Sequence, residues 1–170
     1  MSALARRIDI REARRIDLDD VAELERISFP VPWKRAYFDA EVGAPFRFNR
    51  VARDERGGLL GYVFCAFAGG EIHVNKIAVS PQARRQGLAT RLMDEVFTLG
   101  RDLRTEEIYL EVRVSNTPAR LFYERLGFST AGRRPRYYLD GEDALVMVCR
   151  LPDSRLDAVP REKRDSPRVK

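Results

Sequence analysis

The segment SPQARRQGLATRL, residues 80–92, combines several features that suit phosphate binding. Pro81 ends an apolar, strand-like segment, and a helical pattern begins soon afterwards. The first turn of a helix leaves about four backbone N–H groups without partners, and the helix dipole favours an anion there. Gly87 allows the backbone to approach a ligand closely, and Arg84 and Arg85 add positive charge beside it. The segment therefore predicts a diphosphate site, although an ordinary strand-to-helix turn with solvated arginines uses the same residue types.

Glu111 is a carboxylate inside an apolar segment, LEVRVSN, which spans residues 110–116. Its neighbours Leu110 and Val112 alternate with it as in a half-buried strand. An acid in a strand is commonly paired with a cation, and Arg113 lies two residues away on the same face. The segment by itself leaves two interpretations, a carboxylate used in chemistry and a carboxylate held in an ion pair.

Strands and helices alternate along the chain, which predicts a mixed α/β fold. Apolar residues at helical spacing, from Leu88 to Leu99, indicate a helix directly after the phosphate-binding segment. Further helices are expected at residues 17–28 and 34–42 and from about Pro118. Strands are expected at residues 7–12, 47–70 (as a hairpin), 71–80 and 110–114, near Phe128, and at 143–151.

Two long motifs, in the right order, resemble the GNAT acetyltransferase superfamily. NKIAVSPQARRQGLATRLM resembles the acetyl-CoA signature, with Arg84, Gly87 and Ala89 matching its Q/R-x-x-G-x-G/A pattern. IYLEVRVSNTPARLFYERLGF resembles the next segment of the RimI-like ribosomal-protein and protein N-terminal acetyltransferases. RRPRYYLDGEDALVM is similar to the end of the archaeal-type N-terminal acetyltransferases, so the likeness covers about residues 72–150, with weaker agreement back to residue 8.

The resemblance implies the GNAT fold, a mixed and mostly antiparallel sheet that is splayed between its fourth and fifth strands and flanked by helices. Acetyl-CoA is the implied co-substrate, its pantetheine arm entering the opening between those strands, and no metal is implied. A backbone N–H near Val79 would stabilise the tetrahedral oxyanion of acyl transfer. The residues implied in binding acetyl-CoA are Ile77, Ala78, Val79, Arg84, Arg85, Gln86, Gly87, Leu88, Ala89, Thr90, Asn116 and Tyr123.

The resemblance also implies three catalytic residues. Glu111 matches the base of the RimI-like enzymes, and His73 matches a histidine of the archaeal-type enzymes that faces the same cleft. Either residue, or both as a relay through water, would accept the proton of the attacking amine. Tyr123 matches the tyrosine that donates to the departing sulfur.

Two loops are implied in substrate binding. SFPVPWKRAYF matches the substrate loop of these families and supplies Phe29, Pro30 and Val31, while Tyr137 and Tyr138 match a tyrosine pair that holds the peptide backbone. The archaeal-type motif Leu-Pro-Glu-Asn-Tyr has an acid at a place that Val31 or Pro32 occupies here, which leaves open whether this chain handles initiator-methionine termini.

These features predict a protein Nα-acetyltransferase in which the amine attacks the thioester directly and no acyl-enzyme forms. The expected partners are N-terminal segments of proteins, ribosomal proteins included. Two alternatives stay open: acetylation of a small amine such as a polyamine or an aminoglycoside, and a non-catalytic module that binds the ribosome or RNA.

The amino-acid composition indicates which class of protein this chain belongs to. With 170 residues, 44% hydrophobic and 34% charged, the chain is expected to be soluble, with one domain at residues 1–151 and a charged, disordered tail at 152–170. No segment reaches the roughly 18 apolar residues of a membrane span. The N-terminus lacks the apolar core of a secretory signal, so a cytoplasmic location is expected.

The net charge of +5 is spread along the whole chain, with 31 basic residues against 26 acidic ones. That distribution disfavours a dedicated nucleic-acid face, and contact with nucleic acid is expected only through ribosome association. Cys65 and Cys149 lie in apolar strand-like segments without metal-ligand spacing, so both are expected to be reduced core thiols. The sequence leaves monomer and dimer open.

Overall fold

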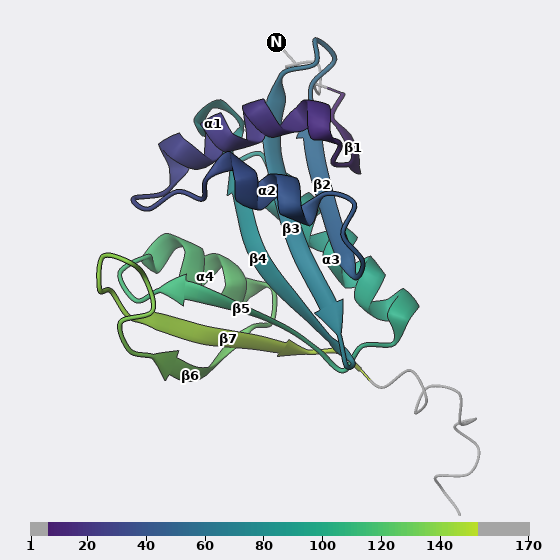
Figure 1. Cartoon of the computed structure of the whole chain (residues 1–170). Coiled ribbons are helices and arrows are strands. Elements are labelled where there is room, and N and C mark those ends of the chain that lie inside the picture. The colour runs from purple at the N-terminus through teal and green to yellow at the C-terminus, as the bar shows by residue number, and fades with distance from the viewer. Residues whose placement is uncertain (1–6, 153–170) are drawn as a thin grey trace, which may run out of the picture.

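The computed structural model describes residues 7–152, so the predicted tail lies outside the described residues except for Pro152. Within this range the strands form a seven-stranded sheet in the order β1-β2-β3-β4-β5-β7-β6 (Figure 1). β4 and β5 are parallel, and the other neighbouring pairs are antiparallel. The predicted mixed, mostly antiparallel sheet is confirmed. The strands are β1 (Asp9–Glu12), β2 (Arg47–Arg53), β3 (Leu59–Ala68), β4 (Glu71–Val79), β5 (Glu107–Arg113), β6 (Ser129–Arg134) and β7 (Ala144–Arg150).

Helices cover both faces of the sheet. In Figure 1, α1 (Leu18–Ser28) and α2 (Arg35–Glu41) lie in front of β2, β3 and β4, and α3 (Leu88–Leu103) lies behind them. α4 (Thr117–Arg125) packs on the same side as α3 through a shared apolar core. None of the described helices is long and apolar enough to cross a membrane.

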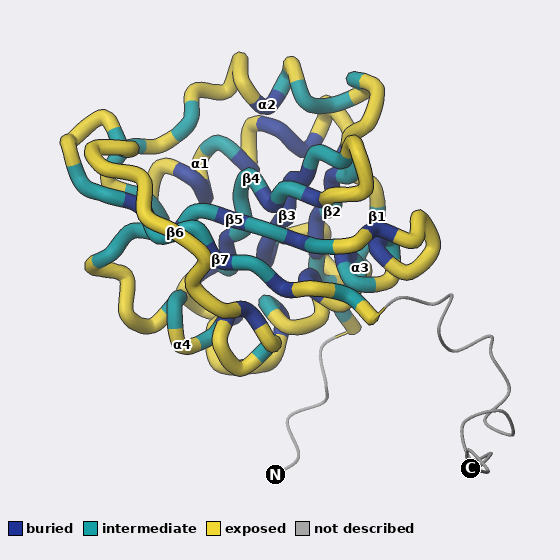
Figure 2. Tube along the Cα trace, turned by 90° about the horizontal axis from the view of Figure 1, so that it is seen from below, coloured by how far each residue is buried: buried dark blue, intermediate teal, exposed yellow. Residues whose placement is uncertain are grey.

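Side chains along β3 point alternately into two hydrophobic cores, one on each face of the sheet. Val63 and Cys65 face α3 and α4, whereas Tyr62 and Phe64 face α1 and α2. These four side chains are fully buried, and Figure 2 shows buried segments concentrated in the central strands. Cys149 is also a free, buried thiol, so the prediction that both cysteines lie in the core is confirmed.

The sheet splits between β4 and β5. The two strands pair from Glu71 opposite Glu107 to Val74 opposite Leu110, and beyond these residues they diverge (Figure 1). β4 remains paired with β3 as far as Val79, and β5 remains paired with β7. The backbone N–H and C=O groups on the facing edges are therefore open to a ligand. The predicted splay between the fourth and fifth strands is confirmed.

β4 also carries a bulge at the point of divergence. Two consecutive residues of β3 pair with Val74 and Lys76, which leaves Asn75 as the extra residue. A bulge adds one unpaired residue and changes which side chains share a face. As a result His73 and Lys76 both point toward the side of the sheet covered by α1 and α2, although they are three residues apart.

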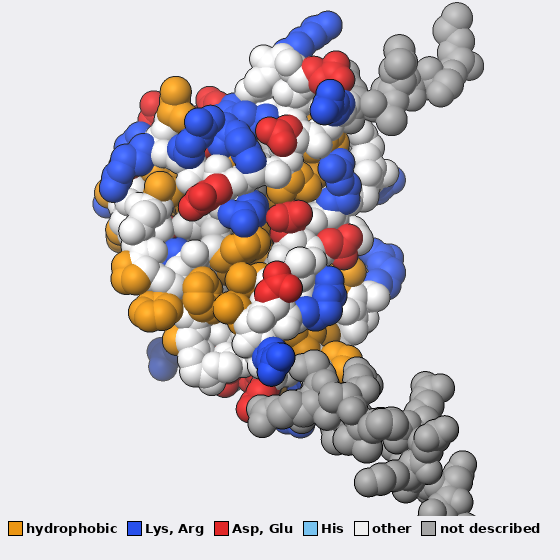
Figure 3. Space-filling view, turned by 90° about the vertical axis from the view of Figure 1, so that its right-hand side faces the viewer, with side chains coloured by type: hydrophobic (Ala, Val, Ile, Leu, Met, Phe, Trp, Pro, Cys, Tyr) orange, Lys and Arg blue, Asp and Glu red, His pale blue; other side chains and the backbone are white. Residues whose placement is uncertain are grey.

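Basic and acidic side chains are interspersed on the face shown in Figure 3, with apolar side chains between them. Oppositely charged side chains pair with one another at the surface of the protein, as Arg50 does with Glu95 at 3.5 Å. This face carries no continuous basic stripe of the kind that tracks a nucleic-acid backbone.

Candidate active site

A cleft of about 400 Å³ opens where β4 and β5 diverge. Its walls come from the α1–α2 loop, β4, β5, the start of α4 and the β6–β7 loop. Pro30, one of the predicted substrate residues, is not among the residues that line it. The predicted site residues that do line the cleft are Phe29, Val31, His73, Ile77, Glu111, Asn116, Tyr123, Tyr137 and Tyr138.

Glu111 and His73 meet in this cleft. Nε2 of His73 lies 2.5 Å from Oε2 of Glu111, and the Glu111 side chain is 7% exposed. His73 pairs with Tyr109 across the parallel ladder, and the two rings stack at 4.4 Å with an angle of 5° between their planes. Glu111 follows Tyr109 by two residues and therefore projects from the same face of the sheet. The two candidate bases thus form one hydrogen-bonded pair with a fixed ring orientation.

Arg113 does not pair with Glu111, although both side chains project from the same face of β5. Its guanidinium contacts Asp140 and Glu142 instead, at 2.8 Å each, and lies 4.0 Å above the ring of Tyr138. The cation beside Glu111 is Arg134, whose Nε lies 3.4 Å from Oε1. Glu111 therefore has an ion-pair partner from β6 in addition to His73, and the sequence did not single out Arg134.

A second cavity, of about 220 Å³, continues from the cleft toward the phosphate-binding segment. The two cavities share Phe29, Ile77, Ala119 and Tyr123. The remaining lining residues of the second cavity are Ser28, Ala78, Val79, Arg84, Ala89 and Phe122. An extended ligand could therefore run along the open edge of β4 from the start of α3 to Glu111.

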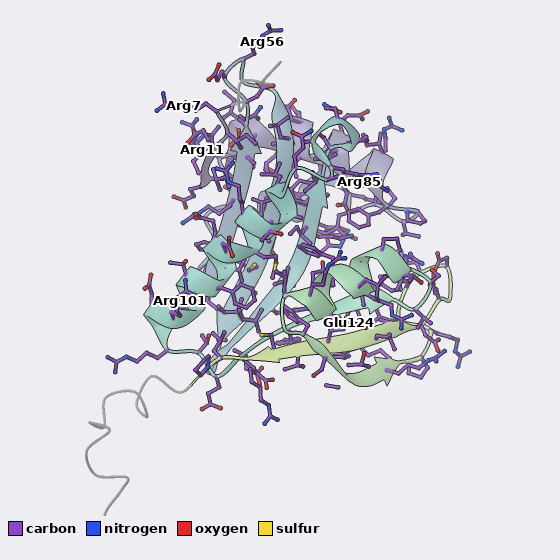
Figure 4. The ribbon with its side chains drawn as sticks, turned by 180° about the vertical axis from the view of Figure 1, so that it is seen from behind. Arg7, Arg11, Arg56, Arg85, Arg101 and Glu124 are labelled. Atoms are coloured by element: carbon purple, nitrogen blue, oxygen red, sulfur yellow. The ribbon has the colours of Figure 1, made fainter. Side chains whose placement is uncertain are left out.

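The turn before α3 has the backbone shape of an anion site. Arg85 and Gly87 both adopt the left-handed conformation, with φ of 58° and 76°, and Gly87 is the N-cap of α3. The first helical hydrogen bond runs from the N–H of Arg91 to the carbonyl of Gly87, so the three amides between them have no earlier partner in the helix. Figure 4 shows Arg85 beside the upper end of α3 and Arg101 at its lower end. Arg84 folds back and donates to the carbonyl of Val79 at 3.2 Å.

Tyr123 lies between the two cavities with its ring buried. The ring packs against Phe128, with centroids 5.6 Å apart, so the residue also stabilises the core. Burial raises the pKa of the Tyr123 phenol well above its ordinary value. The hydroxyl therefore keeps its proton at neutral pH and can donate a hydrogen bond.

The Acetyltransferase (GNAT) family profile matches residues 18–128. The chain belongs to this family. A putative bS18 ribosomal protein alanine N-acetyltransferase from Bacillus subtilis is 34% identical over 139 residues, which cover 81% of this chain and 92% of the relative. An N-alpha-acetyltransferase from Saccharolobus solfataricus is 34% identical over 151 residues, covering 82% and 90%. The crystal structure of the ribosomal-protein-S18-alanine N-acetyltransferase from Escherichia coli matches with a TM-score of 0.77 at 28% identity, covering 85% of this chain and 94% of that one.

Membership in the GNAT family makes the chain an acetyl-CoA-dependent N-acetyltransferase. The geometry fits this co-substrate. The free amides at the start of α3 suit the diphosphate, and the open edge of β4 from Asn75 to Val79 suits the amide-bearing pantetheine arm. The second cavity joins those two regions to the cleft that holds Glu111.

Asn116 has a structural role that the sequence analysis did not anticipate in this GNAT domain. It is the N-cap of α4, and its Oδ1 accepts a hydrogen bond from the N–H of Ala119 at 3.3 Å. Because a capping oxygen satisfies an otherwise unpaired helical N–H, this contact orients the side chain. The capping contact uses only Oδ1 of Asn116, not its amide nitrogen.

The wall of the cleft that carries Phe29 and Val31 contains one residue that the resemblance did not indicate, Lys76. Trp33, Tyr37 and Lys76 line it beside Phe29 and Val31. On the opposite wall the rings of the predicted tyrosine pair meet edge to face at 5.1 Å. Trp33 and Tyr37 belong to the aromatic segment SFPVPWKRAYF. Lys76 reaches the cleft through the bulge in β4, which no sequence pattern predicted.

Among the described residues, no three His, Cys, Asp or Glu side chains gather as a metal site would require. His73 is the single histidine of the chain, and its Nε2 is occupied by Glu111. The described residues of the cleft include a carboxylate–imidazole pair, which can accept a proton, and the buried phenol of Tyr123.

Proposed function

We propose that this GNAT enzyme is a protein Nα-acetyltransferase, which transfers acetyl from acetyl-CoA to the α-amino group of protein N-termini. The names of the relatives in Bacillus subtilis and Saccharolobus solfataricus support this substrate class. The two loops that flank the cleft support it as well, because Phe29 and Val31 on one side and the tyrosine pair on the other bound a channel for an extended chain. Ribosomal proteins are among the substrates that we propose.

The observation that carries this proposal is the charge of the cleft. Among the described residues that line it, Glu111 is the only acid. A polyamine or an aminoglycoside presents several cations, and binding them would call for several carboxylates. A peptide N-terminus presents one amine at its end, which matches one carboxylate at the inner end of the cleft. The small-amine alternative is therefore less well supported.

In the proposed reaction, Glu111 and His73 receive the proton that the α-amine loses. An α-amino group has a pKa of about 7.7–8.0, so a modest base suffices near neutral pH. The amine nitrogen forms a bond to the thioester carbonyl carbon, and the C–S bond breaks. Tyr123 donates to the departing sulfur, and the reaction needs no covalent acyl-enzyme.

The residues proposed to bind acetyl-CoA form two groups, one at its pantetheine arm and one at its diphosphate. The open backbone of Ile77, Ala78 and Val79 binds the pantetheine arm, with Asn116 and Tyr123 beside it. The diphosphate lies on the turn and the first helical amides, to which Arg84, Arg85, Gln86, Gly87, Leu88, Ala89 and Thr90 contribute.

We also propose that the enzyme acts in the cytoplasm. The free thiols of Cys65 and Cys149 suit a reducing compartment. Contact with RNA is proposed only through association with ribosomes, and the one face shown in Figure 3, where acidic and basic side chains are interspersed, is consistent with this. A non-catalytic module is disfavoured by the intact pair of Glu111 and His73.

Release of free CoA thiol during incubation with acetyl-CoA tests the proposal. Peptides that begin with Ser, Ala or Met are compared with the same peptides carrying a blocked α-amine and an internal lysine, and with spermidine. We expect turnover on the free N-termini and none on the blocked peptides. Turnover on spermidine alone would assign the enzyme to small amines, and turnover on the blocked peptides would assign it to lysine side chains.

A further inference from the structure

Glu25 is a carboxylate of α1 that is completely buried, and the catalytic steps above make no use of it. Three donors surround it. Its Oε1 accepts from the backbone N–H of Trp33 at 2.9 Å and lies 2.8 Å from Nζ of Lys76, while Oε2 accepts from the hydroxyl of Tyr62. The carboxylate thus connects α1, the α1–α2 loop, β3 and β4.

Lys76 is the charged partner of Glu25, and it contacts the same loop a second time. Its ammonium lies 4.2 Å from the centroid of the Phe29 ring and 5.4 Å from that of Trp33. A cation over an aromatic face is attracted by the ring, most strongly where water is excluded. The Lys76 side chain is only 14% exposed, so these contacts lie at the inner surface of the loop.

The position of these contacts matters because they lie at the edge of the split sheet. Phe29, Trp33 and Lys76 all line the cleft. Beyond Val74, β5 no longer pairs with β4, so no ladder hydrogen bonds between those two strands hold the wall of the cleft here. Lys76 of β4 contacts the loop through the rings of Phe29 and Trp33. Its charged partner, Glu25 of α1, accepts the backbone N–H of Trp33, so the pair links the loop to both α1 and β4.

We propose that Glu25 and Lys76 are positioning residues that hold the Phe29–Trp33 loop in the shape that captures the peptide substrate. This inference rests on the proposed function and goes beyond it, because it assigns substrate capture to a pair outside the catalytic residues, one member of which, Glu25, is completely buried. Removing one partner leaves the other charge buried and uncompensated, which strongly disfavours the closed arrangement. The chemical step, which depends on Glu111, His73 and Tyr123, is left in place.

The first test is the Lys76→Met variant, which keeps most of the apolar stem and removes the ammonium. We expect the KM for the peptide to rise about tenfold, with kcat and the KM for acetyl-CoA changed by less than about twofold, the pattern of lost substrate binding. Arg50→Met is a matched control, because Arg50 is also a strand cation that pairs with a helix carboxylate and lies over an aromatic ring, 4.0 Å from Phe48. Arg50 does not line the cleft, and its variant should retain the wild-type constants.

A second test measures how accessible the loop is to solvent. Trp33 is the only tryptophan in the chain, so its fluorescence reports this loop without interference. We expect Lys76→Met to increase quenching of Trp33 by acrylamide, because the loop is released from β4, and Arg50→Met to leave quenching unchanged. Should Lys76→Met not fold, Tyr62→Phe removes one hydrogen bond to Glu25, keeps the charged pair, and should move both readouts in the same direction by a smaller amount.

The outcomes separate the two proposals. An unchanged peptide KM together with unchanged quenching would overturn the positioning role, and so would a fall in kcat at constant KM. If the wild-type enzyme acetylates no peptide, the proposed function fails, and the quenching of Trp33 still decides whether the pair holds the loop.

Discussion

The imidazole of His73 and the carboxylate of Glu111 are in direct contact, 2.5 Å apart, although 38 residues separate them in the chain. His73 lies within the short parallel ladder between β4 and β5, and Glu111 directly follows the last paired residue of β5, Leu110, where the strands begin to diverge. The split proposed to admit acetyl-CoA and the pair proposed to accept the proton therefore lie at the same feature of the sheet.

Glu111→Gln should lower kcat/KM for the peptide about 100-fold or more, the ordinary effect of losing a positioned base. The affinity for acetyl-CoA, measured by titration calorimetry, should stay the same because the co-substrate contacts lie on β4 and α3. Glu107→Gln, at the other end of β5, serves as the control and should be fully active. Full activity of Glu111→Gln from pH 6 to 9 would show that another group is the base.

His73→Ala should also lower kcat, and its effect should not add to that of Glu111→Gln. Residues that act as one unit show strongly non-additive losses, because removing either member disables the unit. Steady-state kinetics of the two single variants and the double variant measure this coupling. Losses that multiply in the double variant would mean that the two side chains act independently despite their contact.

Tyr123→Phe should lower kcat about 100-fold while the protein stays folded, since phenylalanine keeps the ring packed against Phe128. Thermal unfolding checks the fold, and single-turnover kinetics check the chemical step. Because burial holds the Tyr123 pKa above the ordinary value of about 10, kcat of the wild type should show no loss from phenol ionisation below about pH 10. A variant with unchanged kcat would assign Tyr123 to packing alone.

Asp17→Asn should lower the free energy of unfolding by about 3 kcal/mol at pH 7, because Asp17 is a buried carboxylate between Arg11 and Arg53. Burial opposes its ionisation, but hydrogen bonds from Arg11, from the backbone N–H of Arg14 and from Arg53 outweigh that cost and hold its pKa well below the ordinary range. A lowered pKa stabilises the fold above about pH 4, the unfolded value, and this stabilisation is lost as the pH falls toward the folded value.

Denaturant unfolding at pH 7 and pH 3 measures this effect, and the difference between Asp17→Asn and the wild type should shrink at the lower pH. The control is Glu23→Gln, which breaks an exposed pair with Arg26 three residues away and should leave stability unchanged. Equal differences at both pH values would mean that the ionisation of Asp17 does not stabilise the fold.

Local patterns predicted a large part of this protein. The run from Leu88 to Leu99 was predicted to be a helix from its apolar spacing, and it forms most of α3. The left-handed Gly87 and the free amides after it also follow from a contiguous segment. Contiguous residues could be interpreted in this way because backbone conformation and helix periodicity depend on neighbours in the chain.

Contacts between distant strands could not be predicted in the same way. The sequence analysis left open whether Glu111 pairs with Arg113, and the structure assigns Arg113 to Asp140 and Glu142. Which cation reaches Glu111 depends on how β5, β7 and β6 are aligned, and a shift of one residue would reverse every side chain.

The amino-acid sequence by itself determined the family motifs, the phosphate-binding turn and the types of side chain available for chemistry. Only the tertiary structure decided that His73 and Glu111 form one pair, that a bulge turns Lys76 toward Glu25, and that Glu25 also meets the backbone of the loop at Trp33. The physical reason is that motifs are local, whereas the register and the bulge of a sheet are set by packing and hydrogen bonding among strands far apart in the chain.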